Sequence, residues 1–331
     1  GHTAKGGSGA ENLENLISQV KGHDKIKLHL NTRIQNVDGF VGNFKTIMLE
    51  NDQEVELEHG AAVLATGASP YEPAEYAYGQ DQRILTSLEL DRKFQKEDPG
   101  LEKINSAAFI QCVGSREPGR MYCSRVCCTH SIENAIEHKK RNPEMNVYIL
   151  YRDIRTYGEK EYLYKQARQQ GVIFIRYSLE DKPSVEVKDD SIAITVTDHI
   201  LNRPVELNVD LLTLATAIIP CKDEELANFF KVPMNEDGFF IERHAKLGPA
   251  EFATDGVFLC GMAHYPKPID ESIAQAKAAV ARAITLLSRQ YIYSSGTIAE
   301  VDPVNCAACG VCVAVCPYSA PSFAEEGRFA G

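Results

Sequence analysis

The sequence lacks an excess of positive charge and any long apolar run. Its 46 acidic and 35 basic residues leave a net charge of −11, which argues against nucleic acid or anionic membranes as partners. The longest strongly apolar stretch, around Leu211–Ile219, falls well short of the ~20 residues that a membrane span needs. The first residues show no basic-then-apolar secretory pattern. These absences predict a cytoplasmic protein without a membrane span.

Cysteines are too few for a disulfide scaffold, with only 10 in 331 residues. Eight of them nevertheless fall into two tight groups, which is typical of metal ligation in a reducing compartment. The central group is Cys112, Cys123, Cys127 and Cys128, and the C-terminal group is Cys306, Cys309, Cys312 and Cys316.

The C-terminal group has the spacing C-x2-C-x2-C-x3-C-P from Cys306 to Pro317. This is the bacterial ferredoxin run, in which thiolates bind a [4Fe–4S] cluster. The fourth cysteine of such a run ligates the other cluster of a two-cluster ferredoxin. Either Cys316 closes a single cluster here, or the chain is a piece of a longer protein; the second interpretation is favoured.

The central group lies where a doubly wound fold would carry a glycine-rich phosphate loop. A strand-like stretch, 107–110, precedes Cys112, and a helix-like stretch, 131–140, follows Cys128. Thiols there indicate an iron–sulfur cluster, a redox-active disulfide such as Cys123–Cys127, or a zinc site. Adjacent cysteines are poorly placed to form a disulfide with each other. The residues alone leave these three alternatives open.

An internal repeat relates two parts of the chain. The segment 56–67 aligns without gaps on 206–217, which predicts two domains of one type. Between the copies, strand-like and helix-like segments alternate as in a parallel α/β sheet. Strands are also predicted at Lys25–Val37, Asn43–Glu50, Glu54–Leu64, Phe239–Glu242 and Val257–Cys260, and helices at Ala10–Val20, Ser131–Arg141, Glu159–Gln170 and Ile273–Gln290.

Three stretches carry a resemblance to a known family. They are Cys112 to Ala135 with its Cys-Ser-Arg-Val-Cys-Cys run, Gly39-Phe-Val-Gly-Asn-Phe44, and Cys260-Gly-Met-Ala-His-Tyr-Pro to Lys277. Together they resemble HdrA, the iron–sulfur flavoprotein of heterodisulfide reductase. The same motifs are found in the flavoproteins of quinone-interacting oxidoreductase complexes. The resemblance runs from Leu13 to the C-terminal cysteines.

The resemblance implies an α/β fold of two dinucleotide-binding-type, thioredoxin-reductase-like domains and a C-terminal ferredoxin-like module. It also implies FAD and a central [4Fe–4S] cluster bound by Cys112, Cys123, Cys127 and Cys128. The expected division is a first part of the FAD domain in 1–100, an inserted NAD(P)-domain-like unit with the cluster in 101–221, the rest of the FAD domain in 222–293, and a partial ferredoxin-like module in 294–331.

Two segments resemble flavin motifs of two-dinucleotide-domain flavoproteins. One is an Ala-Thr-Gly strand end, and the other is the run 254–261, which usually continues with aspartate where this chain has Met262. The candidate FAD-binding residues are Ala65, Thr66, Gly67, Gly261, Met262, Lys267 and Ile269. The first Gly-x-Gly-x-x-Gly strand of an FAD domain is absent, so a missing N-terminal part is expected.

The predicted function is that of an electron-transfer iron–sulfur flavoprotein within a larger complex. Its expected partners are other subunits of a heterodisulfide-reductase-like complex and hydrogenase or ferredoxin-type electron carriers. The resemblance also allows a homodimer and flavin-based electron bifurcation. The enzymatic alternative is a pyridine-nucleotide-dependent disulfide oxidoreductase with a redox-active cysteine pair. The non-enzymatic alternative is a cluster-bearing scaffold or sensor. No catalytic residue is assigned.

Overall fold

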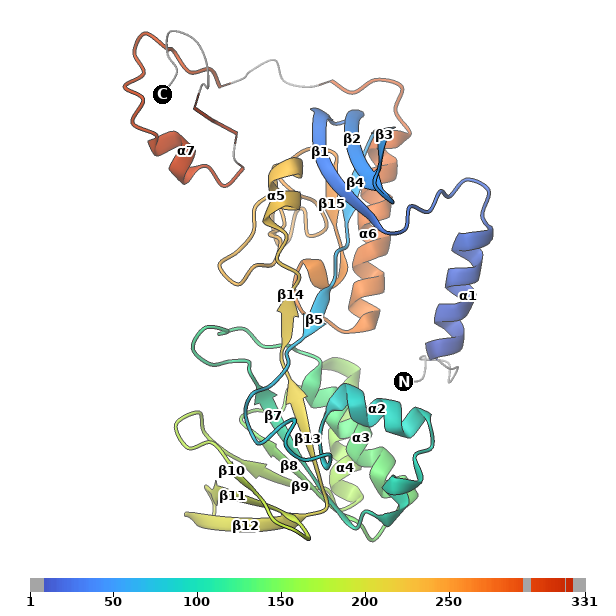
Figure 1. Cartoon of the computed structure of the whole chain (residues 1–331), viewed down its shortest axis with the longest axis vertical. Coiled ribbons are helices and arrows are strands. Elements are labelled where there is room, and N and C mark those ends of the chain that lie inside the picture. Colours follow the sequence, from blue (N-terminus) through green and yellow to red (C-terminus); the bar gives the residue numbers. More distant parts are fainter. Residues whose placement is uncertain (1–8, 294–298, 319, 324–331) are drawn as a thin grey trace.

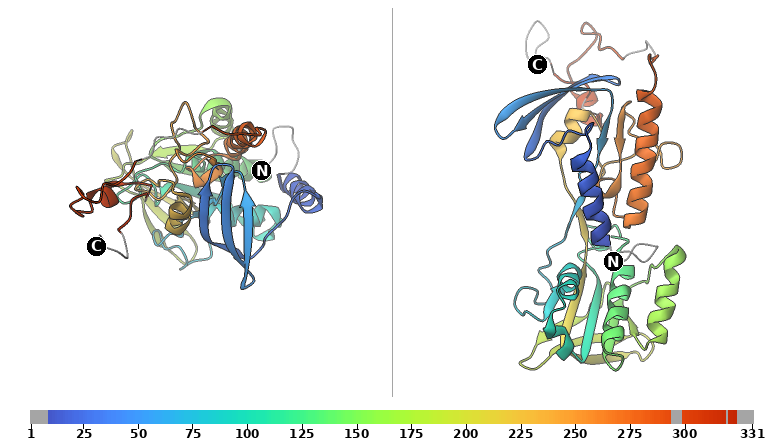
Figure 2. Two further views of the ribbon diagram at one scale, coloured as in Figure 1. Left: turned by 90° about the horizontal axis from the view of Figure 1, so that it is seen from above. Right: turned by 90° about the vertical axis from the view of Figure 1, so that its right-hand side faces the viewer.

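The computed structural model describes residues 9–293, 299–318 and 320–323. Most of these residues form two halves stacked along the long axis of the molecule (Figures 1 and 2). The upper half of Figure 1 contains residues 32–70 and 218–287, and the lower half contains 71–217. The chain therefore enters the lower half once and returns to the upper half once.

A parallel sheet of five strands forms the centre of the lower half. Its order is β6 (Ile84–Thr86), β13 (Leu211–Thr216), β7 (Ser106–Val113), β8 (Asn146–Tyr151) and β9 (Ile173–Arg176), and every neighbouring pair is parallel. The inner strand β7 is almost wholly buried. Apolar residues on both faces are what such a sheet requires when both sides are covered.

Different layers cover the two faces of this sheet. Three helices lie on one face: α2 (Ser87–Gln95), α3 (Cys127–Arg141) and α4 (Glu161–Gln169). An antiparallel sheet covers the other, formed by β10 (Ser184–Val187), β11 (Ile192–Asp198) and β12 (Arg203–Val209). Alternate residues of β7 point into the two cores, because side chains alternate along a strand.

The upper half is built around fewer strands. An antiparallel sheet, β1 (Thr32–Phe40), β2 (Asn43–Glu50) and β3 (Gln53–His59), lies beside a parallel pair, β4 (Ala62–Leu64) and β15 (Val257–Leu259). Two helices complete it, α5 (Glu224–Phe230) and α6 (Ile269–Leu287). No helix in the described ranges is long and apolar enough to cross a membrane.

The internal repeat is visible where the chain passes between the halves. β5 (Ala68–Pro70) pairs antiparallel with β14 (Ile218–Pro220), and Ser69 lies opposite Ile219 at the centre of the pair. The two central residues are 150 positions apart, the same offset as the sequence repeat. The two copies therefore cross at equivalent residues, which confirms that the repeat is structural.

Several predicted boundaries differ from the structure. The first strand begins at Thr32 rather than Lys25, and Phe239–Glu242 forms only an isolated bridge between Met234 and Phe240. β6 and α2 were not predicted, and they place residues 84–95 in the lower half, ahead of the expected boundary at 101. The helix expected from Ser131 begins at Cys127. Short segments of this kind have too few residues for a periodic pattern to reveal them.

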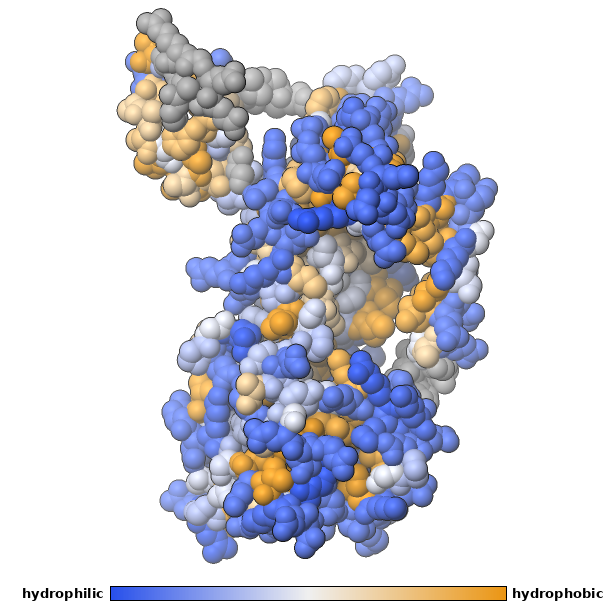
Figure 3. Space-filling model, in the orientation of Figure 1, coloured by the Kyte–Doolittle hydropathy of each residue, from blue (hydrophilic) through white to orange (hydrophobic). Residues whose placement is uncertain are grey.

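Two peripheral segments contribute little to the core. α1 (Gly9–Gly22) forms as predicted, but none of its residues is buried, and its apolar side chains give the orange surface at the right of Figure 3. The C-terminal segment contains one short helix, α7 (Val311–Val315), and none of its described residues is buried. Three single-turn 3-10 helices occupy Pro99–Lys103, Gly158–Lys160 and Gly261–Ala263.

Candidate functional site

The central cysteines meet at one edge of the lower sheet. Cys112 lies near the end of β7, Cys123 lies in the loop that follows, and Cys127 and Cys128 form the first turn of α3. In a parallel α/β unit, strand carboxyl ends and helix N-termini gather at the edge where ligands bind. Cys112 itself has a left-handed backbone (φ 61°), which bends the chain out of the strand at this edge.

The four thiols lie within electrostatic reach of one another. Burial, followed by the charges of Cys128, Cys112 and Cys123, raises the pKa of Cys127 well above its usual range. Burial also raises the pKa of Cys128 to about 11, with Cys112 and Cys123 adding to the shift. Four buried thiols cannot all ionise together without a nearby cationic group. The iron of a cluster would supply that positive charge.

The spacing of the thiols bears on which metal group they fit. All ten cysteines are free thiols. Among the described residues, no three Cys, His, Asp or Glu side chains are arranged to hold one metal ion. A zinc site needs its ligands to converge on a single point, whereas each thiolate of a cluster binds its own iron. The donor set therefore fits a cluster better than a single zinc ion.

Donor groups already point at these sulfurs. Arg116 Nη1 lies 3.9 Å from Cys112 Sγ, and the backbone N–H of Arg125 donates to Cys123 Sγ at 3.3 Å. Arg116 also binds the Asp153 carboxylate at 2.6 Å. Positive charge and N–H donors stabilise anionic sulfur, so this loop is suited to thiolate ligands.

The cysteine loop is fastened to the strand that leads back to the upper half. Ile218 donates its N–H to Ser124 Oγ at 2.9 Å, and Tyr122 donates its hydroxyl to the Ile218 carbonyl at 2.8 Å. Gly114 has a positive φ of 73°, and a Cβ there would lie 2.3 Å from the Tyr71 ring. The loop thus depends on a glycine packed against an aromatic ring.

Substituting Gly114 with alanine is expected to lower the free energy of unfolding more than the same change at Gly79. Gly79 has a similar φ of 78° but open space around a Cβ, so it controls for backbone strain alone. The clash with Tyr71 adds about 1–3 kcal/mol of overpacking cost. Urea unfolding of the two variants measures the difference, and equal losses would refute the packing role of Gly114.

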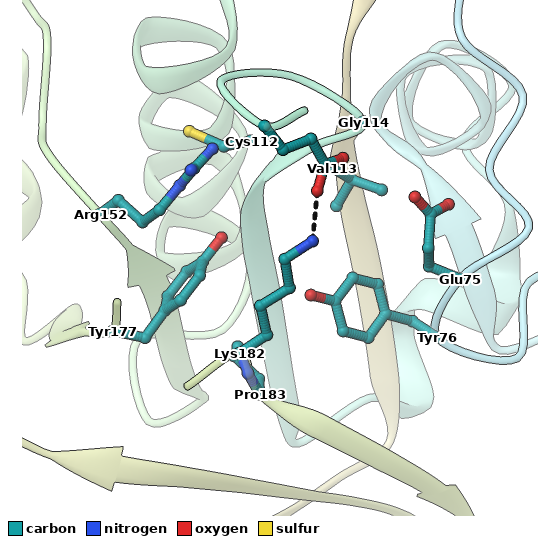
Figure 4. Close-up of a pocket in the computed structure, with 10 residues that line it drawn as sticks. Glu75, Tyr76, Cys112, Val113, Gly114, Arg152, Tyr177, Lys182 and Pro183 are labelled. Atoms are coloured by element: carbon teal, nitrogen blue, oxygen red, sulfur yellow. Dashed lines mark hydrogen bonds and ion pairs between the residues drawn. The ribbon is translucent and has the colours of Figure 1, made fainter. Parts of the chain in front are cut away.

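A small cavity lies on the other side of Cys112 (Figure 4). Lys182 points into it between Tyr177 and Tyr76, and Arg152 and Cys112 lie behind them. Its volume is about 160 Å³, below the roughly 300–1,000 Å³ of ordinary ligand pockets. A dinucleotide does not fit into this cavity as it stands.

The cysteine loop also contacts the upper half of the molecule. Arg125, between Cys123 and Cys127, donates to the Glu271 carboxylate on α6 at 2.9 Å and to the Pro266 carbonyl at 3.3 Å. Three aromatic rings, those of Tyr122, Phe239 and Tyr265, pack together beside it. A group bound by the cysteines would therefore lie next to the upper half.

The candidate flavin residues gather at one edge of the upper half. β4 and β15 are parallel, and Cys260 donates its N–H to the Leu64 carbonyl at 3.2 Å, so their ends coincide. Ala65, Thr66 and Gly67 follow the first strand, and Gly261 and Met262 follow the second. The predicted motifs are thus brought together.

Two glycines at this edge leave their backbone open. Gly67 and Gly261 have φ values of 77° and 71°, and no heavy atom lies within 4 Å of a Cβ built on either. Open backbone of this kind allows a cofactor to approach closely, which fits FAD. Ile269 is 78% exposed at the start of α6, so no contact in the described chain supports its predicted flavin role.

Lys267 is buried at the same edge. Its ammonium group donates to the carbonyls of Gly261 and Tyr265 at 2.6 and 3.0 Å. A polar network that the sequence did not reveal lies alongside: Gln275 accepts the Gly261 N–H at 3.1 Å and donates to His264 at 2.8 Å. No periodicity marks such residues, because their contacts depend on the folded loop.

The burial of Lys267 predicts a pH dependence of stability. Burial, followed by the charge of Arg125, lowers its pKa from 10.5 to about 8. Between these values the unfolded chain binds the proton and the folded chain does not, so the free energy of unfolding should rise with pH. The rise amounts to at most roughly 3 kcal/mol. Urea unfolding at about pH 7 and about pH 10 should show this slope, and a Lys267→Met variant should lose it.

The C-terminal cysteines are not brought together by the described part of the chain. Cys306, Cys309 and Cys312 are exposed, and Cys316 is half-buried. The ferredoxin-like module therefore stays a prediction based on its motif. Small cluster and metal modules commonly fold only with their metal.

Sequence comparison gives several relatives. The chain is 36% identical over 301 residues to an iron-sulfur subunit of the CoB–CoM heterodisulfide reductase of Methanopyrus kandleri, covering 84% of this chain and 45% of that protein. It is 35% identical over 298 residues to the corresponding subunit of the H(2):CoB-CoM heterodisulfide,ferredoxin reductase of Methanothermobacter marburgensis, with 84% and 44% coverage. The chain thus spans about half the length of these curated relatives. No protein-family model matches it.

Structural comparison supports the fold. Thioredoxin reductase of T. acidophilum aligns with a TM-score of 0.54 at 12% identity, covering 85% of this chain and 81% of that one. LpdA of Mycobacterium tuberculosis aligns with a TM-score of 0.52 at 12% identity, covering 84% and 53%. The predicted thioredoxin-reductase-like α/β fold is confirmed, and the sequence relationship shows that the chain belongs to the HdrA family of heterodisulfide reductase.

Proposed function

We propose that this chain is the electron-relay part of a heterodisulfide-reductase-type iron–sulfur flavoprotein, which is an oxidoreductase. FAD would bind at the upper edge formed by residues 65–67 and 261–267. A [4Fe–4S] cluster would bind at Cys112, Cys123, Cys127 and Cys128. FAD can exchange two electrons and a cluster carries one at a time, so together they can divide an electron pair.

One observation carries this proposal. The cysteine loop reaches the upper half directly, through the Arg125–Glu271 ion pair and the aromatic contact of Tyr122 with Tyr265, whose ring centroids are 5.9 Å apart. The two predicted cofactor sites therefore belong to neighbouring surfaces of one molecule. Such proximity is what electron transfer between them requires.

The chain's own residues would hold the groups and set their electrostatics. Arg116 and the Arg125 backbone supply donors to the cysteine sulfurs, and Lys267 fixes the Gly261 loop. The C-terminal module would carry a second [4Fe–4S] cluster at Cys306, Cys309, Cys312 and Cys316 and pass electrons to partner subunits or to hydrogenase- and ferredoxin-type carriers. The names of the relatives, which include a heterodisulfide,ferredoxin reductase, favour such partners and leave bifurcation as a further proposal.

The test is anaerobic purification followed by quantification of iron, sulfide and flavin, and by reduction with a viologen as one-electron donor. Both flavin absorbance and an iron–sulfur EPR signal should respond to the reduced viologen. Rapid reduction of the flavin by NADH or NADPH, with turnover of a disulfide substrate, would instead support a pyridine-nucleotide-dependent oxidoreductase. Iron without flavin would favour a scaffold or sensor.

A further inference from the structure

A strip of buried polar side chains lies between α3 and the lower sheet, behind the cysteines. Each member has at least one polar atom without a hydrogen-bond partner in the described structure, and none is more than 6% exposed. The members are Gln111, Ser131, Asn134, His138 and Thr213. An unpaired buried donor or acceptor bears its full desolvation penalty, so these atoms call for partners that the protein alone does not supply.

Gln111 is the most unusual member. It is fully buried, and both its Nε2 and its Oε1 atoms lack partners among the described residues. It immediately precedes Cys112 in the sequence. Its own carbonyl accepts the Tyr177 hydroxyl at 2.5 Å, so the main chain is held in place while the side chain is not.

The register of β7 and α3 places Gln111 at the cysteine end of the strip. Phe109 packs in the helix-side core, so Gln111, two residues on, faces the same helices. The Phe109 ring lies 6.2 Å from that of His138. Two strand residues advance about 6.6 Å, and four residues of the oppositely running helix about 6 Å. Gln111 is therefore level with Asn134, roughly two turns from the helix start at Cys127.

The chemistry of the carboxamide matches what lies on either side of it. An iron–sulfur cluster presents sulfur atoms that accept hydrogen bonds and offers no donor, whereas Gln111 Nε2 is an unpaired donor. On the helix side, the Ser131 hydroxyl and Asn134 Nδ2 are unpaired donors that suit the Gln111 Oε1 acceptor. A cluster at the cysteines would therefore satisfy the side of Gln111 that the protein leaves open.

We propose that Gln111 is a positioning residue for the central cluster, donating a hydrogen bond from Nε2 to one of its sulfur atoms. This inference rests on the proposed function, because it requires a cluster at the four cysteines. Hydrogen bonds to the sulfurs help set the potential of a cluster. They stabilise the more negative, reduced state, so Gln111 raises the reduction potential.

The test is an EPR-monitored redox titration of the iron-loaded chain in which Cys309 and Cys312 are serine, so that only the central site contributes. Adding Gln111→Leu should lower the ratio of reduced to oxidised cluster about tenfold at a fixed potential, which is a ~59 mV lower midpoint for a one-electron couple. Thr213→Val is the matched control. Thr213 is also fully buried with an unpaired hydroxyl, but it lies opposite Phe109, farther from the cysteines, so its midpoint should not change.

The outcomes separate the two claims. An assembled cluster with an unchanged midpoint in Gln111→Leu would overturn the role of Gln111 and leave the proposed function standing. Absence of a cluster from the parent chain would overturn the proposed function itself. If Gln111→Leu does not assemble a cluster, pulsed EPR of the parent labelled with ¹⁵N-glutamine decides. A nitrogen coupling to the cluster is expected, and its absence would rule out the hydrogen bond.

Discussion

Replacing Cys127 with serine is expected to remove about four iron atoms per chain, the content of one [4Fe–4S] cluster, while leaving the flavin bound. Cys127 is only 6% exposed and lies in the first turn of α3. Its buried thiolate needs the positive charge of the cluster. Without this ligand, the remaining three thiols hold the cluster poorly, whereas the residues at the flavin edge do not change.

Cys221 provides the matched control for this substitution. It is a free, partly exposed thiol that follows β14, and its sulfur lies 3.7 Å from the Ser69 hydroxyl, away from the central cysteines. Cys221→Ser should therefore keep the full iron content. Iron and sulfide analysis of both variants, purified without oxygen, measures the effect. Unchanged iron in Cys127→Ser would remove the central cysteines from the metal site.

Replacing Gly261 with valine is expected to reduce the flavin content more than tenfold with iron unchanged. The backbone at Gly261 has a φ of 71°, where a side chain is disfavoured by about 1–2 kcal/mol. The added side chain also enters the open space that a flavin would occupy. Together these costs exceed the 1.4 kcal/mol that corresponds to a tenfold loss of affinity.

Gly79 separates backbone strain from loss of cofactor space. Its φ of 78° and its open surroundings match those of Gly261, but it lies in the lower half, outside the flavin edge. Gly79→Val should retain its flavin. Absorbance spectra of the purified proteins give the flavin content, and equal retention in both valine variants would show that FAD does not approach Gly261.

The sequence predicted the parts of the fold that have a strong periodic pattern or a repeat. The buried strands around Phe109, Ile149 and Leu212 are continuous apolar runs, and the 150-residue offset anticipated the crossing of β5 and β14. β6 has only three residues, too few for a pattern. Its place in the sheet is determined by pairing with β13, a strand that lies more than a hundred residues later in the chain.

The candidate site was predictable in its ligands and not in its surroundings. The spacing of Cys112 to Cys128 identified the thiols. The contact of Arg125 with Glu271 joins residues that are 146 positions apart, so no local motif contains it. The same holds for Gln111, whose burial opposite α3 follows from strand register. Ile269 shows the converse error: its place in a family motif suggested a flavin contact, yet its side chain is exposed.

The most direct measurement is the iron content and EPR spectrum of the full chain with Cys309 and Cys312 both replaced by serine. In that variant only Cys112, Cys123, Cys127 and Cys128 remain as a complete ligand set. The account predicts about four iron atoms per chain and, on reduction, an EPR signal from one cluster that is lost when Cys127→Ser is added. A variant that folds and binds flavin but carries no iron would contradict a cluster at the central cysteines.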